Sequence, residues 1–222
     1  MKVKIITVEL CDNEVSRRDT PKIRGYISSR FEEHVALHHH TGKGFLYQYP
    51  LVQYKAIGRR PYIVGIGKGA EVIKKIEPQL IELEMSGESH NIYEKRIRFG
   101  YHNFGITQGL NQYKFVTPWM ALNQSNYYKY IRCDEQKKTE LLKKVLIGNL
   151  LSMSKTLEYH VDQVISVMLQ VEPINVNFKN QEMLAFKGSF LSNFDIPDYM
   201  GIGKSVSRGF GTIVKQTKTS YK

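Results

Sequence analysis

Hydrophobic and polar positions in the first half of the chain alternate between the pattern of strands and the pattern of helices. The pattern predicts strands over residues 2–10, 45–57, 62–67 and 92–99, and helices over residues 21–33 and 70–83. Thr20 and Pro21 mark the start of the first helix, as its N-cap and its first helical residue. Pro78 is expected to kink or shorten the second helix. The strand–helix–strand–strand–helix–strand order is that of a ferredoxin-like unit.

A long amphipathic helix, predicted over residues 134–160, is the clearest element of the second half. Its hydrophobic stripe, which we expect to lie in the core, consists of Leu142, Leu146, Leu150, Met153 and Leu157. Strands are predicted over residues 163–171, 174–178, 183–192 and 212–216. The pattern of residues 101–126 predicts neither a helix nor a strand clearly. The two halves are therefore interpreted as two consecutive units of similar type.

The charge balance narrows the class of partner. The 222 residues include 32 Lys and Arg against 21 Asp and Glu, a net charge of +11. Such an excess favours an anionic partner, with nucleic acid first and an acidic membrane surface next. A basic protein without such a partner is the alternative.

Cysteine usage and hydropathy indicate the compartment. Cys11 and Cys133 match no zinc spacing and indicate no disulfide framework. The first residues lack the hydrophobic region of a signal peptide, and no window approaches the length of a membrane span. We therefore expect a soluble, cytoplasmic protein that does not enter a membrane.

Three consecutive histidines, His38, His39 and His40, precede a Gly-Lys-Gly turn and a strand rich in tyrosine. Histidine titrates near neutral pH, so the cluster indicates acid–base catalysis or metal binding. A solvated polar loop is the alternative. A metal site would need a further carboxylate or histidine, and a helix would turn the nearby Glu32 and Glu33 in different directions.

A glycine-rich segment, residues 201–211, precedes the last predicted strand. Its glycines let the backbone approach a ligand closely, and Lys204 and Arg208 add positive charge. Such a segment suits a partner rich in phosphate. Its Gly-Lys-Ser piece is not a Walker A loop, because Asp198 stands where that motif needs a glycine.

A second glycine cluster, residues 65–69, follows a predicted strand and precedes a helix. Its third glycine comes one position too early for a dinucleotide-binding loop. The acidic residue that this motif needs about twenty positions later, at the end of a second parallel strand, is also absent. Dinucleotide binding is therefore disfavoured.

The Gly-x-Gly-x₅-Gly-x-Gly spacing of residues 201–211, with its embedded basic residues and the following strand, resembles the glycine-rich loop of the repeat-associated RNA-binding superfamily of CRISPR systems. The first half agrees with this resemblance. Residues 21–25 (Pro-Lys-Ile-Arg-Gly), the His-x-His pair, residues 49–55 (Tyr-Pro-Leu-Val-Gln-Tyr-Lys) and residues 63–66 (Ile-Val-Gly-Ile) together resemble CRISPR repeat-RNA processing endoribonucleases. The most similar subfamily has two active-site histidines after the first helix.

The resemblance extends from the first strand to Val214. It implies an α+β fold of two tandem ferredoxin-like domains with antiparallel sheets, here residues 1–98 and 99–222. It also implies that precursor CRISPR RNA binds across the domains and is cleaved within the repeat without a metal or another cofactor. Similar proteins keep the product or pass it to a CRISPR effector complex, and they occur as homodimers or as monomers bound to an effector.

The resemblance also assigns catalytic residues. The family's His-x-His pattern falls on His38 and His40, although His39 makes the assignment ambiguous by one residue. Two imidazoles can serve as the base and the acid of RNA cleavage. Lys43 and Tyr47 are the candidates for orienting the scissile phosphate and stabilising its charge.

RNA binding is expected from the glycine-rich loop, through Gly201, Gly203, Lys204, Ser205, Arg208, Gly209 and Gly211. Further basic candidates, some of which could simply be solvated, are Arg59, Arg60, Lys215 and Lys218. Lys55 is a weaker catalytic candidate, for which a structural role is equally expected. A relative that only holds RNA is the second hypothesis. A DNA-binding repressor is disfavoured, because the sequence shows no helix-turn-helix signal.

Overall fold

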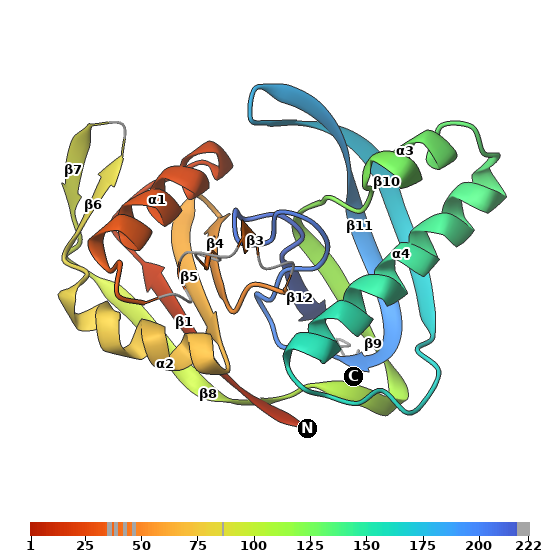
Figure 1. Ribbon diagram of the computed structural model, residues 1–222, viewed down its shortest axis with the longest axis horizontal. Coiled ribbons are helices and arrows are strands. Elements are labelled where there is room, and N and C mark those ends of the chain that lie inside the picture. Colours follow the sequence, from red (N-terminus) through yellow and green to blue (C-terminus); the bar gives the residue numbers. More distant parts are fainter. Residues whose placement is uncertain (35–36, 38–39, 42–43, 46–47, 86, 217–222) are drawn as a thin grey trace, which may run out of the picture. The chain divides into compact units, whose positions relative to one another are not determined.

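The computed structural model describes residues 1–216 except 35–36, 38–39, 42–43, 46–47 and 86 (Figure 1). Of residues 40–41 and 44–45 it describes the backbone only. The chain forms two compact units. The N-terminal unit comprises Lys2–His102 and Val206–Gly209, and the C-terminal unit comprises Met1, Asn103–Ser205 and the chain from Phe210 onward. None of the described helices is long and apolar enough to cross a membrane.

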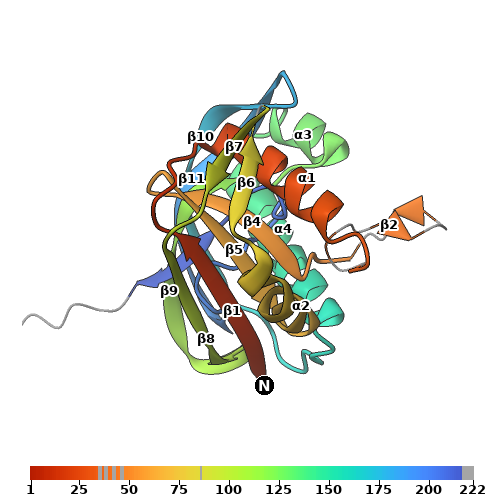
Figure 2. The ribbon, with the colours of Figure 1, turned by 90° about the vertical axis from the view of Figure 1, so that its left-hand side faces the viewer.

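The N-terminal unit contains a four-stranded antiparallel sheet in the order β4-β5-β1-β8. Its strands are β1 (Lys2–Leu10), β4 (Val52–Ile57), β5 (Arg60–Ile66) and β8 (Lys95–Asn103). Helices α1 (Thr20–Arg30) and α2 (Lys68–Ile76) lie on the same face of the sheet (Figure 2). The core between them includes Ile6, Val8, Ile23, Tyr54, Ile63 and Ile73. This element order and strand order confirm the predicted ferredoxin-like unit.

The first helix differs from its prediction at both ends. Thr20 is not the N-cap but the first helical residue, and its side chain is fully buried. Asp19 occupies the cap position, while its carboxylate accepts a hydrogen bond from the backbone N–H of Ser16. That bond belongs to a capping box on the preceding 3₁₀ turn, η1 (Arg17–Asp19). The helix ends at Arg30 rather than at residue 33.

Two other predicted elements were too long. The helix predicted over residues 70–83 ends at Ile76 and continues as a 3₁₀ turn around Pro78, η3 (Glu77–Gln79), which agrees with the expected effect of that proline. A hairpin of β6 (Glu82–Met85) and β7 (Glu88–Asn91) follows. The strand predicted over residues 45–57 is two strands, β3 (Gly44–Phe45) and β4.

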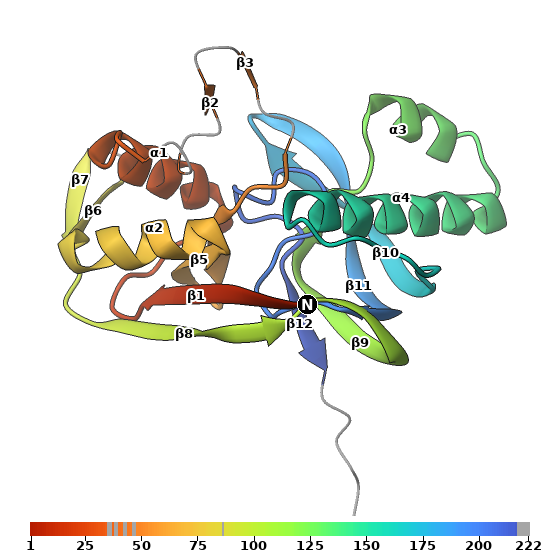
Figure 3. The same cartoon turned by 60° about the horizontal axis from the view of Figure 1, so that its bottom comes forward.

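The C-terminal unit contains a second four-stranded antiparallel sheet, in the order β10-β11-β9-β12. Its strands are β9 (Gly105–Trp119), β10 (Val167–Phe178), β11 (Gln181–Asp195) and β12 (Ile213–Gln216), and its helices are α3 (Gln124–Tyr130) and α4 (Glu135–Thr156). The long helix α4 packs against the sheet (Figure 3) through its stripe, of which Leu142, Leu146, Leu150 and Met153 are buried as predicted.

The two sheets share one topology. In each, the second and third strands form one side, and the first strand lies between the third and the fourth. Between the third and fourth strands of the second sheet, residues 196–212 contain the glycine-rich segment and form no helix. Tandem ferredoxin-like units with antiparallel sheets are thus confirmed as the fold. The predicted boundary between residues 98 and 99 stays a prediction.

Pro173 explains one error in the second half. Two strands were predicted on either side of it, but β10 runs through it without a break. Proline lacks the backbone N–H that a central strand would use, yet β10 is an edge strand, where that donor is not needed on the outer side.

Candidate functional site

The histidine segment lies between α1 and β4 of the N-terminal unit. His40 and Thr41 form a short strand, β2, which pairs with β3 so that His40 stands opposite Phe45. His38, His39, Lys43 and Tyr47 lie outside the described residues, and of His40 only the backbone is described. The catalytic roles assigned to these residues stay predictions.

Part of the glycine-rich segment belongs to the same unit. The backbone of Arg208 forms a parallel β-bridge with Tyr54 of β4. Gly209 has a φ of +86°, and a Cβ there would lie 3.2 Å from the Thr20 side chain and 3.3 Å from the Tyr54 carbonyl oxygen. Glycine therefore allows the segment to approach both α1 and β4 closely.

Two cations and a buried hydroxyl meet at this point. Burial, and then the positive charge of Arg208, lower the pKa of Arg24 on α1. The Thr20 hydroxyl, one turn earlier on the helix and beside Gly209, is buried and has no hydrogen-bond partner among the described residues. Two guanidinium groups and a hydroxyl are donors that a phosphate oxygen can satisfy, and an anion would relieve the repulsion between the cations.

The rest of the segment is fixed by the C-terminal unit. Gly203 has a φ of +95°, and a Cβ there would lie 2.7 Å from the indole nitrogen of Trp119. The next residue, Lys204, donates its backbone N–H to the Met120 carbonyl at 2.9 Å, and its side chain is exposed. This geometry holds a cation on a short, fixed loop.

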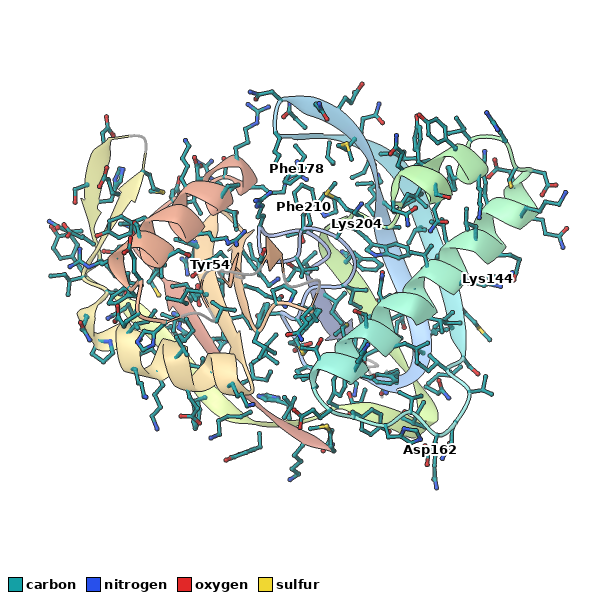
Figure 4. The ribbon with its side chains drawn as sticks, in the orientation of Figure 1. Tyr54, Lys144, Asp162, Phe178, Lys204 and Phe210 are labelled. Carbon is teal, nitrogen blue, oxygen red and sulfur yellow. The ribbon has the colours of Figure 1, made fainter. Side chains whose placement is uncertain are left out.

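Gly211 closes the loop. Its φ is +62°, and a Cβ there would collide with the Ile202 carbonyl oxygen. Ile202 donates its backbone N–H to the Gly211 carbonyl at 2.8 Å, and Gly211 donates to the Pro118 carbonyl at 2.8 Å. The neighbouring Phe210 packs edge-on against Phe178 of β10, with 5.4 Å between ring centroids (Figure 4).

The other basic candidates form ion pairs. Arg59 contacts Glu14 at 2.6 Å, Arg60 contacts Glu9 at 2.9 Å, and the Lys215 ammonium contacts Asp195 at 3.0 Å. Lys218 lies outside the described residues. These pairs favour the structural alternative for Arg59, Arg60 and Lys215. Sequence reasoning did not single out Arg24 as a binding residue, although it follows Thr20 by one helical turn and so shares its face.

Lys55 is the most unusual ionisable group of the unit. Its side chain is fully buried on β4, and its ammonium nitrogen has no hydrogen-bond partner among the described residues. Burial lowers the pKa of Lys55 to about 7. Such a side chain is not presented to a dissolved substrate, which favours the structural role over the catalytic one.

A metal centre is not evident in the described part of the chain. No three His, Cys, Asp or Glu side chains come together there as possible ligands. Because the histidine segment is only partly described, the metal alternative is tested by experiment below.

Comparison with known proteins decides the family. Residues 1–103 match the model of the Cas6b N-terminal domain, and residues 105–216 match that of the Cas6b C-terminal domain. The chain belongs to the Cas6b family. This confirms the predicted relationship to CRISPR RNA-processing proteins, whereas the assignment to a two-histidine subfamily stays a prediction.

Two solved Cas6b structures resemble the whole chain. A crystal structure of Cas6b has a TM-score of 0.93 and 40% sequence identity, and the match covers 97% of this chain and 100% of that one. A CRISPR RNA processing endoribonuclease Cas6b has a TM-score of 0.80 and 38% identity, with the same coverage. An uncharacterized protein of Methanocaldococcus jannaschii is 42% identical over 135 residues, which are 60% of this chain and 92% of that protein.

Proposed function

We propose that this Cas6b protein binds precursor CRISPR RNA and cleaves it within the repeat, without a metal ion. The proposal rests foremost on the match of both halves of the chain to the Cas6b domains. It is supported by 38% identity, over almost the full length, to a solved CRISPR RNA processing endoribonuclease. The net charge of +11 suits a polyanionic substrate.

The cluster of Arg24, Arg208 and Thr20 supports RNA binding beside α1 and β4 of the N-terminal unit. The histidine segment leaves α1 and returns to β4, and these two elements carry Thr20, Arg24 and Tyr54. Arg208 reaches the same elements through its bridge to Tyr54. The phosphate-binding donors and the histidine segment are therefore attached to the same helix and strand.

The chemistry follows from two imidazoles. One of His38 and His40 takes the proton from the 2′-hydroxyl, whose oxygen then attacks the adjacent phosphorus. The bond from phosphorus to the 5′-oxygen breaks, and the other histidine, in its protonated form, gives its proton to that oxygen. The products are a 2′,3′-cyclic phosphate and a 5′-hydroxyl. Lys43 and Tyr47 are the proposed stabilisers of the charge on the phosphorane.

The alternative is a protein of the same fold that holds repeat RNA and does not cut it. Catalysis and binding separate when the purified protein is incubated with the repeat RNA of a neighbouring CRISPR array. We expect cleavage that persists in excess EDTA. RNA with a 2′-deoxy substitution at the cut position should bind normally and remain intact, because the nucleophile is missing.

Variants test the residues. His38→Ala and His40→Ala should each lower the cleavage rate by roughly 10²–10⁴-fold while RNA affinity changes little. His90→Ala is the matched control, since His90 is half-buried on β7, outside the histidine segment, and it should cleave normally. Full cleavage by both His38→Ala and His40→Ala would reject the site, and binding without any cleavage by the unaltered protein would favour the alternative. Association with effector subunits and homodimer formation stay predictions.

A further inference from the structure

Strand β8 presents an exposed hydrophobic and aromatic row at the edge of the N-terminal sheet. β8 is the end strand of that sheet, beside β1 (Figure 3). Ile97, Phe99 and Tyr101 alternate along it and therefore share one face. They are 45%, 46% and 62% exposed. Single exposed hydrophobic side chains are common on protein surfaces, but a contiguous exposed row often marks a binding site. The row on β8 therefore indicates a binding partner.

Lysines surround the two rings of this row. The Lys74 ammonium on α2 lies 5.0 Å from the centroid of Phe99, and the Lys4 ammonium on β1 lies 6.0 Å from Phe99 and 5.6 Å from Tyr101. Lys4 also pairs with Glu71, so part of its charge is compensated. Lys74 is exposed, so its positive charge is accessible to a partner at this surface.

The opposite face of β8 is occupied differently. Arg96 points to the other side of the strand and contacts Glu9 of β1 at 2.9 Å. The aromatic row is thus confined to the face that carries α2, where Lys74 stands over Phe99. We refer to Phe99, Tyr101, Lys4 and Lys74 as the β8 platform.

We propose that the β8 platform binds a single-stranded segment of the RNA substrate by base stacking. Aromatic rings accept any base on their faces, and adjacent cations meet the backbone phosphates. Alternate residues on a strand are about 6.6 Å apart. This is roughly twice the 3.4 Å step of a stacked strand, so the rings suit two bases splayed from each other. The assignment rests on the proposed function for the identity of the RNA.

A second copy of the chain is the competing occupant, because an exposed edge strand can pair with another strand. Charge favours RNA. The chain carries a net charge of +11, which opposes self-association, and the platform itself has two lysines against Glu71. The competing occupant becomes an outcome of the experiment.

The test measures binding of single-stranded oligouridine to the full-length protein by fluorescence anisotropy, over a range of salt concentrations. The variant Phe99→Ala with Tyr101→Ala should bind at least about tenfold more weakly. Tyr93→Ala is the matched aromatic control, because Tyr93 is 83% exposed and lies outside β8, and its affinity should equal that of the unaltered protein. Lys74→Gln should reduce the salt dependence by about 0.7 in log–log slope.

A matched charge control is Lys144→Gln on α4 (Figure 4), where the lysine is exposed and remote from β8 in sequence. It should leave the slope unchanged, and an equal effect of both lysine variants would overturn the proposal. Photo-crosslinking of 4-thiouridine RNA to the unaltered protein, followed by mass spectrometry, should label residues 95–103. This measurement keeps the proposal testable where the double alanine variant does not fold, and absence of label there would overturn it.

Two further measurements separate the outcomes. Light scattering of the unaltered protein and of the double variant reports the molar mass, and a dimer that the double variant abolishes would assign the platform to a second copy. Cleavage of repeat RNA is measured in parallel. Absence of cleavage with intact, platform-dependent oligouridine binding would reject only the proposed endonuclease, whereas normal cleavage with unchanged oligouridine binding by the double variant would reject only the platform.

Discussion

The backbone of Arg208 forms a parallel β-bridge with Tyr54 and so attaches a residue of the glycine-rich segment to the free edge of the N-terminal sheet. The attachment brings the charge of Arg208 close enough to Arg24 to contribute to its lowered pKa. Like charges held together cost stability unless an anion binds between them. A phosphate bound beside both guanidinium groups would reduce the repulsion between them.

Arg24→Gln and Arg208→Gln should each weaken RNA binding more than they weaken folding. Each removes a charge-assisted donor, so affinity for repeat RNA should fall by roughly 1.5–3 kcal/mol. Each also removes the repulsion between the two guanidinium groups, which offsets part of what is lost with its other contacts, so the free energy of unfolding without RNA should fall by less than the affinity. Isothermal titration and urea denaturation measure the two quantities. Arg59→Gln, which breaks an exposed pair with Glu14, is the control and should change neither by more than about 1 kcal/mol. Equal losses of affinity in all three variants would contradict a specific site.

Much of the fold could be predicted because the core is periodic. The stripe from Leu142 to Met153 follows helical spacing, and the alternation in residues 2–10 identifies β1. The errors lie where a tertiary or local contact overrides the pattern. The carboxylate of Asp19 accepts a hydrogen bond from Ser16, and α1 begins at Thr20 instead of being capped by it. Strand β10 continues through Pro173 because it lies at the edge of its sheet. The Ser16–Asp19 contact is local, whereas the edge position of β10 cannot be read from its own segment.

The site could be predicted only in part. The spacing of Gly203, Gly209 and Gly211 indicated a loop whose backbone can approach a ligand closely, and in the structure all three have positive φ. Arg24 lies near Arg208 because the glycine-rich segment forms a bridge with Tyr54 of β4. No local sequence pattern predicts that long-range contact. The burial of Lys55 was hidden for a related reason. The sequence left a catalytic and a structural role open for Lys55, and both faces of β4 are covered at Tyr54 and Lys55.

Gly211→Ala should destabilise the protein by at least about 2 kcal/mol, because the residue needs a left-handed φ and a Cβ would meet the Ile202 carbonyl. Gly109→Ala is the matched control. A Cβ at Gly109 would meet nothing within 4 Å, so its effect should stay within about 0.5 kcal/mol. Chemical denaturation of both variants gives the comparison. Equal stabilities would show that the closed loop tolerates a side chain at Gly211.

Phe178 and Phe210 should be energetically coupled, because the ring of β10 packs edge-on against the ring of the glycine-rich segment. A double-mutant cycle with Phe178→Leu and Phe210→Leu should give a coupling of about 0.5–1.5 kcal/mol. The control cycle pairs Phe178→Leu with Phe104→Leu, since Phe104 packs instead against Phe194 and Tyr159. That cycle should be additive within about 0.5 kcal/mol. Additivity in both cycles would mean that Phe178 on β10 does not stabilise the glycine-rich segment.

Lys55 should make the protein more stable as pH rises above neutrality. Burial lowers its pKa in the folded state from 10.5 to about 7, so between these values the unfolded chain binds one more proton than the folded one. The sign is therefore positive: unfolding becomes harder by up to about 1.4 kcal/mol per pH unit. From pH 7 to pH 8.5 the gain should be about 1.5 kcal/mol.

Lys55→Met isolates this contribution, since it keeps the length of the side chain and removes the amine. The variant should be more stable than the unaltered protein at pH 7, and the difference should shrink by about 1.5 kcal/mol at pH 8.5. Lys144→Met, on the exposed surface of α4, is the control and should leave the pH dependence unchanged. Urea denaturation at both pH values measures all three proteins. If Lys55→Met retains the full pH dependence, the amine is charged in the folded state and the prediction of a lowered pKa is wrong.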